Sequence, residues 1–219
     1  METELSLQYP DHLTWTKFKP VLNLGVMASG EGSNFAAILD AINVNNLSAK
    51  VSILVVNNPY CGAKSKADEL GIPCIVHNHR DFDTRESLDR QLVRTFKHFQ
   101  VEGIVMAGWM RVVTSVIIDE YANRIINIHP SLLPSFRGID AIKQSLDAGV
   151  KITGCTVHFV EEGVDSGQLI AQAAVPVKES DSIDSLRRRI QEQEHIILPK
   201  AIASAGIGWR EFSAIMDNK

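Results

Sequence analysis

The sequence predicts a single-domain α/β protein with a mostly parallel, twisted sheet that helices cover on both faces. Apolar runs rich in Val, Ile and Leu alternate with segments whose apolar residues recur at helical spacing. Turn signals such as Asn57-Asn58-Pro59 separate them. The chain has 219 residues, 45% of them hydrophobic, which suits one buried core. This βαβα order is typical of parallel sheets with helices on each side.

Strands and helices are expected to follow one another along most of the chain. The strands are predicted at Val21–Ala28, Val51–Val56, Ile72–His77, Gly103–Ala107, Arg124–Ile128, Lys151–Val160 and Leu169–Val177. The helices are predicted around Phe35–Ile42, over Ala63–Leu70 with Gly71 as its cap, over Leu88–Phe99 with Asp83 and Glu86 as a capping pair, and from Ile183 to near Pro199.

The main domain is expected to cover residues 21–205. Residues 1–20 show no clear period, so we expect an extension that wraps the surface or is disordered, and residues 206–219 are expected to form a C-terminal tail. Acidic residues near the N-terminus argue against a signal peptide, and no apolar stretch is long enough to span a bilayer. Three widely spaced cysteines indicate a reducing compartment, so we expect a cytoplasmic protein.

The charge balance limits the partners that the protein can have. The net charge of −4 gives no large basic field, so we expect neither nucleic acid nor membrane as a partner. A small anion remains possible, because a few local donors can bind one phosphate. His77 and His79 lack the accompanying ligands of a metal site, and Arg187, Arg188 and Arg189 are expected to be a surface charge run.

A glycine-rich loop follows the first predicted strand and opens the first helix. Its sequence Ser29-Gly30-Glu31-Gly32-Ser33-Asn34 offers tight turns, side-chain donors and the free N–H groups of a helix start. It matches neither the dinucleotide fingerprint nor a P-loop. Two interpretations stay open on spacing alone: a cradle for one phosphate, or a tight turn in which Ser33 or Asn34 caps the helix.

Two polar residues end the fifth predicted strand. Asn127 and His129 are two apart, so both should point to one face at the ligand-side edge of the sheet. An amide beside an imidazole can stabilise the oxyanion of an acyl transfer. Asp165 lies in a turn-rich loop and would favour the charged imidazole if it came near, but spacing does not place it there. The alternative for all three is ordinary loop hydrogen bonding.

Five motifs occur in the order found in one enzyme family: SGEGSN, GWMR, NIHPSLLPSF, EEGVDSG and QEQEH. With them, the chain resembles the glycinamide ribonucleotide formyltransferases of purine biosynthesis from about Val21 to about Ile202. The resemblance implies a Rossmann-like enzyme that transfers the formyl group of 10-formyltetrahydrofolate to the amine of glycinamide ribonucleotide. These would be its small-molecule substrates, and we expect a monomer or a homodimer.

The resemblance also implies roles for particular residues. Asn127, His129 and Asp165 would be catalytic, Gly32, Ser33 and Asn34 would hold the substrate phosphate, and Gln191 and Glu194 would lie near the ribonucleotide. The residues implied on the folate side are Arg85, Met110, Arg111, Val112, Val113, Asn127, Glu161, Glu162, Gly163, Val164 and Asp165. Without the resemblance, core packing is the default interpretation for Trp109 and Met110, although they could line a flat aromatic pocket, and Gln191 and Glu194 could be a solvated helix face.

One segment departs from the family pattern. Arg137 and Asp140 stand where many members have Pro and His, and Phe-Arg-Gly is closer to the methionyl-tRNA formyltransferases. The rival functions are that activity, formyltetrahydrofolate deformylation with water as acceptor, and nucleotide binding without chemistry. The first two families carry an added C-terminal or N-terminal domain for which this chain leaves little room, and the third leaves the catalytic trio unexplained.

Overall fold

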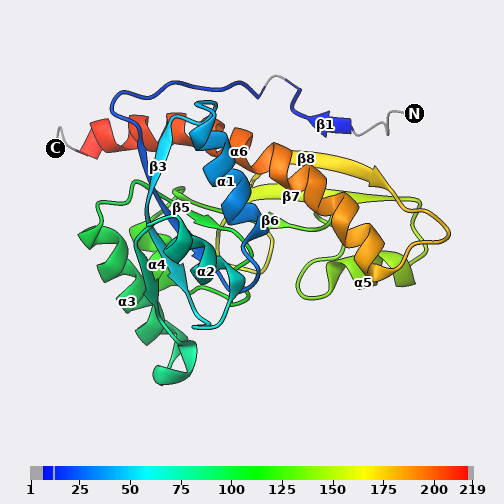
Figure 1. Cartoon of the computed structure of the whole chain (residues 1–219), viewed down its shortest axis with the longest axis horizontal. Coiled ribbons are helices and arrows are strands. Elements are labelled where there is room, and N and C mark those ends of the chain that lie inside the picture. The colour runs from blue at the N-terminus through cyan, green and yellow to red at the C-terminus, as the bar shows by residue number, and fades with distance from the viewer. Residues whose placement is uncertain (1–6, 12, 217–219) are drawn as a thin grey trace.

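The computed structural model describes residues 7–11 and 13–216 and confirms the α/β prediction (Figure 1). Its strands form one sheet in the order β1-β8-β7-β6-β5-β2-β3-β4. The five strands from β6 to β4 are parallel, and β7, β8 and β1 are added antiparallel to their neighbours. Their bounds are β1 Leu7–Tyr9, β2 Leu22–Ala28, β3 Ala49–Val56, β4 Cys74–Val76, β5 Gly103–Met106, β6 Ile125–His129, β7 Ile152–Phe159 and β8 Leu169–Pro176.

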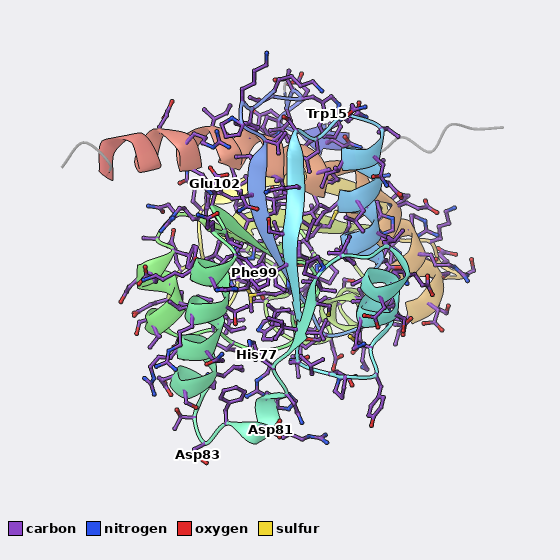
Figure 2. All side chains as sticks on the ribbon, turned by 60° about the vertical axis from the view of Figure 1, so that its left-hand side comes forward. Trp15, His77, Asp81, Asp83, Phe99 and Glu102 are labelled. Atoms are coloured by element: carbon purple, nitrogen blue, oxygen red, sulfur yellow. The ribbon has the colours of Figure 1, made fainter. Side chains whose placement is uncertain are left out.

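Helices cover the two faces of the sheet in separate groups, as Figure 2 shows edge-on. The core on one face packs α1, α2 and α6 against residues such as Leu24 and Val26 of β2. The core on the other face packs α3 and α4 against Met27 and Ile53. The helices are α1 Ser33–Asn43, α2 Gly62–Glu69, α3 Arg85–His98, α4 Ser115–Glu120, α5 Ala141–Asp147 and α6 Ile183–Met216, with a short 3₁₀ helix η1 His79–Asp81.

The last helix corrects the predicted end near Pro199. α6 continues through this proline to Met216 and crosses the molecule as the orange-to-red helix of Figure 1. A proline inside a helix removes one backbone hydrogen bond and destabilises it. Here Leu198, Ala201 and Trp209 are buried in the core on both sides of the proline, so tertiary packing offsets the local defect.

The start of α3 corrects a second prediction. Thr84, not Asp83, is the N-cap: the Ser87 N–H donates to the Thr84 hydroxyl at 3.1 Å, and the Thr84 N–H donates to Ser87 Oγ at 3.3 Å. Glu86 therefore lies in the first turn without completing the predicted capping pair. The reciprocal Thr–Ser arrangement satisfies two N–H groups that the helix itself leaves open.

Part of the segment expected as an extension is ordered structure. β1 pairs with the edge of β8, with Tyr9 opposite Gln172, and the Gln8 amide donates to Gln193 of α6 at 3.0 Å. Leu7 and Tyr9 stay exposed, so periodicity could not reveal a three-residue strand.

Within the described residues, no helix has both the length and the apolarity needed to cross a membrane. The helices α4 and α5 were also not predicted.

Candidate active site

A cavity of about 570 Å³ lies beyond the carboxyl ends of β5 and β6. β6 ends there with Asn127 and His129, and this edge of an open α/β sheet is the usual place for a ligand. Asn127, His129 and Asp165 belong to the cavity lining. The cavity also collects large apolar side chains that are exposed to solvent, which marks a binding surface. These side chains are Met110, Val112, Ile139, Val164 and Ile183.

The structure brings the three predicted catalytic residues into contact. Asn127 and His129 share one face of β6, as the two-residue spacing predicted. Asp165 reaches them from the loop between β7 and β8: its Oδ2 lies 3.2 Å from Nδ1 of His129, and its Oδ1 accepts from the Asn127 amide at 3.4 Å. His129 is only 5% exposed. A carboxylate and an imidazole, both largely buried, thus meet an amide at the cavity wall.

Both ring nitrogens of His129 face hydrogen-bond acceptors. Nδ1 points at the Asp165 carboxylate, and Nε2 donates to the backbone carbonyl of Phe136 at 2.8 Å. A neutral imidazole has only one N–H, whereas the imidazolium can donate at both positions. When both nitrogens carry hydrogens, the ring can donate to the carboxylate and to the carbonyl at once. Phe136 itself adopts a left-handed backbone conformation, with φ of 56°, where non-glycine residues are uncommon.

Asp165 is held as a carboxylate by several donors. Burial alone raises the pKa of Asp165, but the hydrogen bond from His158, the Gly138 N–H at 2.9 Å and the charge of His129 together lower it below its ordinary value. The residue has φ of 49°, so the loop places this side chain with a left-handed turn. An ionised Asp165 can accept a hydrogen bond from Nδ1 of His129.

His158 is a fourth polar residue of the site that the sequence analysis missed. It lies opposite Asn127 in the β6–β7 pair, and its Nε2 is 3.3 Å from the Asn127 amide nitrogen and 3.5 Å from Asp165 Oδ1. Its Nδ1 donates to the Phe159 carbonyl at 2.7 Å. A histidine inside an apolar strand was the available signal, but the pairing register that brings it to Asn127 was not visible in the sequence.

The glycine-rich loop opens α1 with Gly32 at the N-cap position. Gly32 has φ of 72°, and a Cβ there would come within 2.7 Å of the Ala63 backbone, so only glycine fits. Gly32, and neither Ser33 nor Asn34, is the N-cap, so the capping part of the alternative is wrong, while the tight turn that it predicted is present. Nδ2 of Asn34 instead donates to Glu194 Oε2 of α6 at 2.8 Å.

Glu194 is buried rather than on the solvated face of α6. Burial raises the pKa of Glu194 above that of an ordinary carboxyl, although the hydrogen bond from Asn34 acts in the opposite direction. The Oδ1 atom of Asn34 is buried without a hydrogen-bond partner among the described residues. The predicted phosphate loop and the predicted ribonucleotide residue therefore touch, outside the 570 Å³ cavity, whose lining includes neither them nor Gln191.

Most residues implied on the folate side line the cavity, and two do not. Arg85 and Glu162 lie outside the lining. Arg85 is exposed as the first residue of α3, two residues after Asp83, which Figure 2 labels. Nε of Arg111 is buried with no described hydrogen-bond partner. The residues of this set within the lining are Met110, Arg111, Val112, Val113, Asn127, Glu161, Gly163, Val164 and Asp165. In the described part of the chain, no group of three or more His, Cys, Asp or Glu side chains is arranged to hold a metal ion.

Comparison with known proteins places this site in a family. The family described as formyl transferase matches residues 22–202. The "Phosphoribosylglycinamide formyltransferase" of Bacillus subtilis is 38% identical over 177 residues, which cover 81% of this chain and 91% of that protein. The "Trifunctional purine biosynthetic protein adenosine-3" of Drosophila melanogaster is 44% identical over 182 residues, or 82% of this chain. The matched region spans only 14% of that fly protein.

Solved structures agree in sequence and in fold. The glycinamide ribonucleotide transformylase 1 of Symbiobacterium toebii has a TM-score of 0.83 and 39% identity, covering 85% of this chain and 88% of that chain. A phosphoribosylglycinamide formyltransferase from Bacillus halodurans has a TM-score of 0.81 and 35% identity, covering 83% and 94%. The match over residues 22–202 and these relatives together show that the chain belongs to the formyl transferase family.

Proposed function

We propose that the protein is a glycinamide ribonucleotide formyltransferase of purine biosynthesis. It transfers the formyl group of 10-formyltetrahydrofolate to the amine of glycinamide ribonucleotide and releases formyl-glycinamide ribonucleotide and tetrahydrofolate. The observation that carries this proposal is the contact of Asn127, His129 and Asp165 inside one cavity. Relatives of similar length, such as the Bacillus subtilis enzyme, bear the corresponding name. We assign the catalysis to residues 21–205, between the flanking segments 1–20 and 206–219, and place it in the cytoplasm.

The cavity suits a flat, largely apolar donor that carries a few polar groups. Exposed Met110, Val112 and Val164 offer apolar contacts, and the backbone of residues 161–165 offers polar ones. The unpaired Nε of Arg111 offers a donor to an anion. The second substrate is an anion as well, and the open N–H groups at the start of α1, beside Gly32 and Ser33, suit its phosphate.

Transfer requires that the amine nitrogen forms a bond to the formyl carbon and that the bond from that carbon to the folate nitrogen then breaks. The formyl oxygen becomes an oxyanion between these events. We assign its stabilisation to the Asn127 amide and to Nε2 of His129, which must then leave the Phe136 carbonyl. Asp165 orients the His129 ring through Nδ1. No covalent enzyme intermediate is needed, since the amine itself is the nucleophile.

The reaction also moves one proton from the attacking amine to the departing folate nitrogen. Asp165 is ionised and has two oxygens within the site, so it can accept a proton and relay it. His158, within 3.5 Å of the same carboxylate, can steady that charge during the transfer. The chain thus supplies electrostatic stabilisation and a proton path, and the substrates supply the group that moves.

One assay separates the proposal from its rivals. Purified protein is given 10-formyltetrahydrofolate with glycinamide ribonucleotide, with initiator methionyl-tRNA or with water alone, and deformylation of the folate is followed. The proposal expects turnover only with glycinamide ribonucleotide. Equal rates with and without an acceptor would instead indicate a deformylase, and turnover only with the tRNA would indicate a methionyl-tRNA formyltransferase. If the folate keeps its formyl group with all three acceptors, the protein is a nucleotide-binding module without chemistry.

A further inference from the structure

Asp89 is a buried carboxyl group that has no part in the proposed mechanism. It lies on the buried face of α3, next to Leu88, and is only 2% exposed. Burial raises the pKa of Asp89 above its ordinary value, although the hydrogen bonds from Thr114 act in the opposite direction. A carboxyl group in such a place destabilises the fold unless its oxygens accept good hydrogen bonds, so its partners indicate why it is there.

Thr114 is the only hydrogen-bond partner of this side chain among the described residues. Oδ2 of Asp89 accepts the backbone N–H of Thr114 at 2.5 Å and the Thr114 hydroxyl at 2.8 Å. Thr114 is the N-cap residue of α4, yet its side chain makes no capping hydrogen bond to that helix. The hydroxyl that a threonine at this position usually gives to its own helix therefore holds Thr114 against α3.

Thr114 directly follows a stretch of the chain that belongs to the active-site cavity. Every residue from Gly108 to Val113 is part of the cavity lining, whereas Asp89 and Thr114 are not. Residues 108–113 connect β5 to α4 and belong to no helix or strand. Contacts at the two ends of this stretch therefore decide the course of its backbone through the lining.

The other end of the stretch is held by the first residue of the glycine-rich loop. The Ser29 N–H donates to the Gly108 carbonyl at 3.0 Å, and Ser29 Oγ accepts the Met110 N–H at 2.9 Å. These are bonds between neutral groups near the surface, whereas Asp89 offers a buried carboxylate oxygen. Hydrogen bonds to a carboxylate are about twice as strong as those between neutral groups, so the attachment at Thr114 is the firmer one.

We propose that Asp89 is a positioning residue of the enzyme: through Thr114 it fixes the course of residues 108–113 and so the place of the folate donor in the cavity. This inference rests on the proposed function, in which residues 110–113 contact the donor. Asp89 acts through the backbone and not on the ligand, since it lies outside the lining. A loop that is already held in its bound conformation binds its ligand more tightly, because less ordering is left for the binding step.

The alternative is that Asp89 only fastens α3 to α4, which lie side by side in Figure 1. Loss of the contact would then lower stability and leave substrate binding as it is. The structure favours positioning for two reasons. The carboxylate is attached to the residue next to the lining and not to the body of α4, and the Thr114 side chain makes this contact in place of a helix cap.

Threonine variants provide the first test, because they change one hydroxyl and remove no cap. Thr114→Val loses the hydroxyl that donates to Asp89, and Thr114→Ser keeps it. Thr95→Val is the matched control: Thr95 is a buried threonine of α3 outside the lining, and its Oγ1 lies 2.9 Å from His77 Nε2.

Steady-state kinetics with both substrates are measured for each variant. Thr114→Val should raise KM for 10-formyltetrahydrofolate about three- to tenfold and leave KM for glycinamide ribonucleotide within about twofold of the wild type. Its kcat should change less than its KM for the folate. Thr114→Ser should restore most of the loss, and Thr95→Val should leave both KM values unchanged.

Variants of Asp89 test whether the two residues act as one unit. Asp89→Asn retains an oxygen that can accept from both donors of Thr114, so it should recover most of the wild-type KM for the folate. Asp89→Ala should raise this KM at least as much as Thr114→Val does. Adding Thr114→Val to Asp89→Ala should cause no further rise, because the hydroxyl has already lost its acceptor.

Thermal unfolding of every variant separates a loss of folding from a loss of positioning, and the threonine variants decide if Asp89→Ala does not fold. Equal KM values for Thr114→Val and Thr95→Val overturn the role of Asp89, and so do additive effects in the double variant. A wild type that does not turn over glycinamide ribonucleotide overturns the proposed function, whereas an active wild type with an unaffected Thr114→Val overturns only the role of Asp89.

Discussion

The Asp165 carboxylate joins three segments that are distant in the chain. One oxygen accepts the Gly138 N–H and faces His129, and the other accepts the Asn127 amide. The loop that carries the substituted positions Arg137 and Asp140 is therefore tied to the reacting centre through the Gly138 backbone rather than through the substituted side chains. This explains how the segment can depart from the family pattern while the trio keeps its contacts.

We expect Asn127→Ala to lower kcat about a hundred- to a thousandfold, because one oxyanion donor is lost. The KM for both substrates should change little, since the loss is specific to the transition state. Steady-state kinetics provide the measurement, and circular dichroism checks that the variant folds. Turnover within a few-fold of the wild type would remove Asn127 from the mechanism.

Residue spacing predicted part of this site in a physical way. Asn127 and His129 are two residues apart on one strand, so the two-residue period of a strand predicts that they share a face. The approach of Asp165 and His158 did not, because it depends on the antiparallel β6–β7 register and on a left-handed turn at Asp165. Arg187 lines the cavity and was expected only in a surface charge run, because helical spacing does not say which neighbour of a charged run faces a cavity.

At the scale of elements, the start of α6 is fixed by a compact polar cluster. Asp181 accepts from Arg189 at 2.7 and 2.9 Å, from Ser185 at 2.8 Å and from the Lys178 N–H at 2.8 Å. These donors, chiefly Arg189, hold the pKa of Asp181 far below its usual range. The cluster orients the helix that carries Arg187 into the cavity and Glu194 against the glycine loop.

We expect Asp181→Asn to lower the free energy of unfolding by about 2–3 kcal/mol at neutral pH, because an arginine largely inside the protein loses its charge partner. A carboxyl whose pKa is lowered in the folded state stabilises the fold when the pH is above its pKa in the unfolded chain, about 3.9. This contribution is lost as the pH falls below that value toward the folded-state pKa. The difference in unfolding free energy between wild type and variant should thus become smaller below about pH 4.

Urea unfolding at a series of pH values measures this gap. Asp68→Asn, which breaks the exposed Lys64–Asp68 pair, is the matched control and should cost under about 1 kcal/mol. An Asp181→Asn variant that unfolds like the wild type at neutral pH would contradict the role assigned to the cluster.

The start of α3 offers a second test at this scale. Thr84→Ala removes the side-chain acceptor for the Ser87 N–H and should cost about 1 kcal/mol of stability. Asp83→Ala should be nearly neutral, because Asp83 lies outside the observed capping box. Thermal unfolding of the two variants side by side provides the measurement, and a larger loss for Asp83→Ala would restore the capping pair that the sequence suggested.

Strong periodicity predicted the buried elements of the sheet and the long helices, and weak local signals failed elsewhere. Pro199 reads as a helix end when only the local backbone is considered, yet buried Leu198 and Ala201 hold α6 together. β1 has three residues, two of them exposed and apolar, so its existence depends on the free edge of β8. Tertiary contacts decided both outcomes, and no local pattern records them.

At the scale of the whole molecule, the C-terminal half of α6 closes the core at the end of the sheet away from the active site. Trp209 is 1% exposed and donates from Nε1 to the Asn123 carbonyl at 3.0 Å. Arg210 donates to the Pro20 carbonyl at 2.8 Å and pairs with Glu102. The residues that follow position 205 thus fasten β2 and β5 to the helix that serves the site at its other end.

We expect Gly103→Ala to destabilise the protein by about 1–3 kcal/mol, because the added Cβ would lie 2.3 Å from the Trp209 ring. Gly208→Ala is the control, since a Cβ there meets no atom within 4 Å and alanine favours the helix by about 1 kcal/mol. Differential scanning calorimetry should show a lower Tm for the first variant and an equal or higher Tm for the second. A normal Tm for Gly103→Ala would mean that the ring can move aside.

In this structure the N–H at Nε2 of His129 is taken up by the Phe136 carbonyl. The formyl oxygen of a bound donor must compete for this N–H with a backbone acceptor that is already in place and needs no reorganisation. In the proposed mechanism the formyl oxygen receives this N–H only after it replaces that carbonyl, so attack on the formyl carbon, by water as well as by the amine, depends on the exchange. The position of one peptide oxygen therefore sets a condition that any reaction at the formyl carbon must meet.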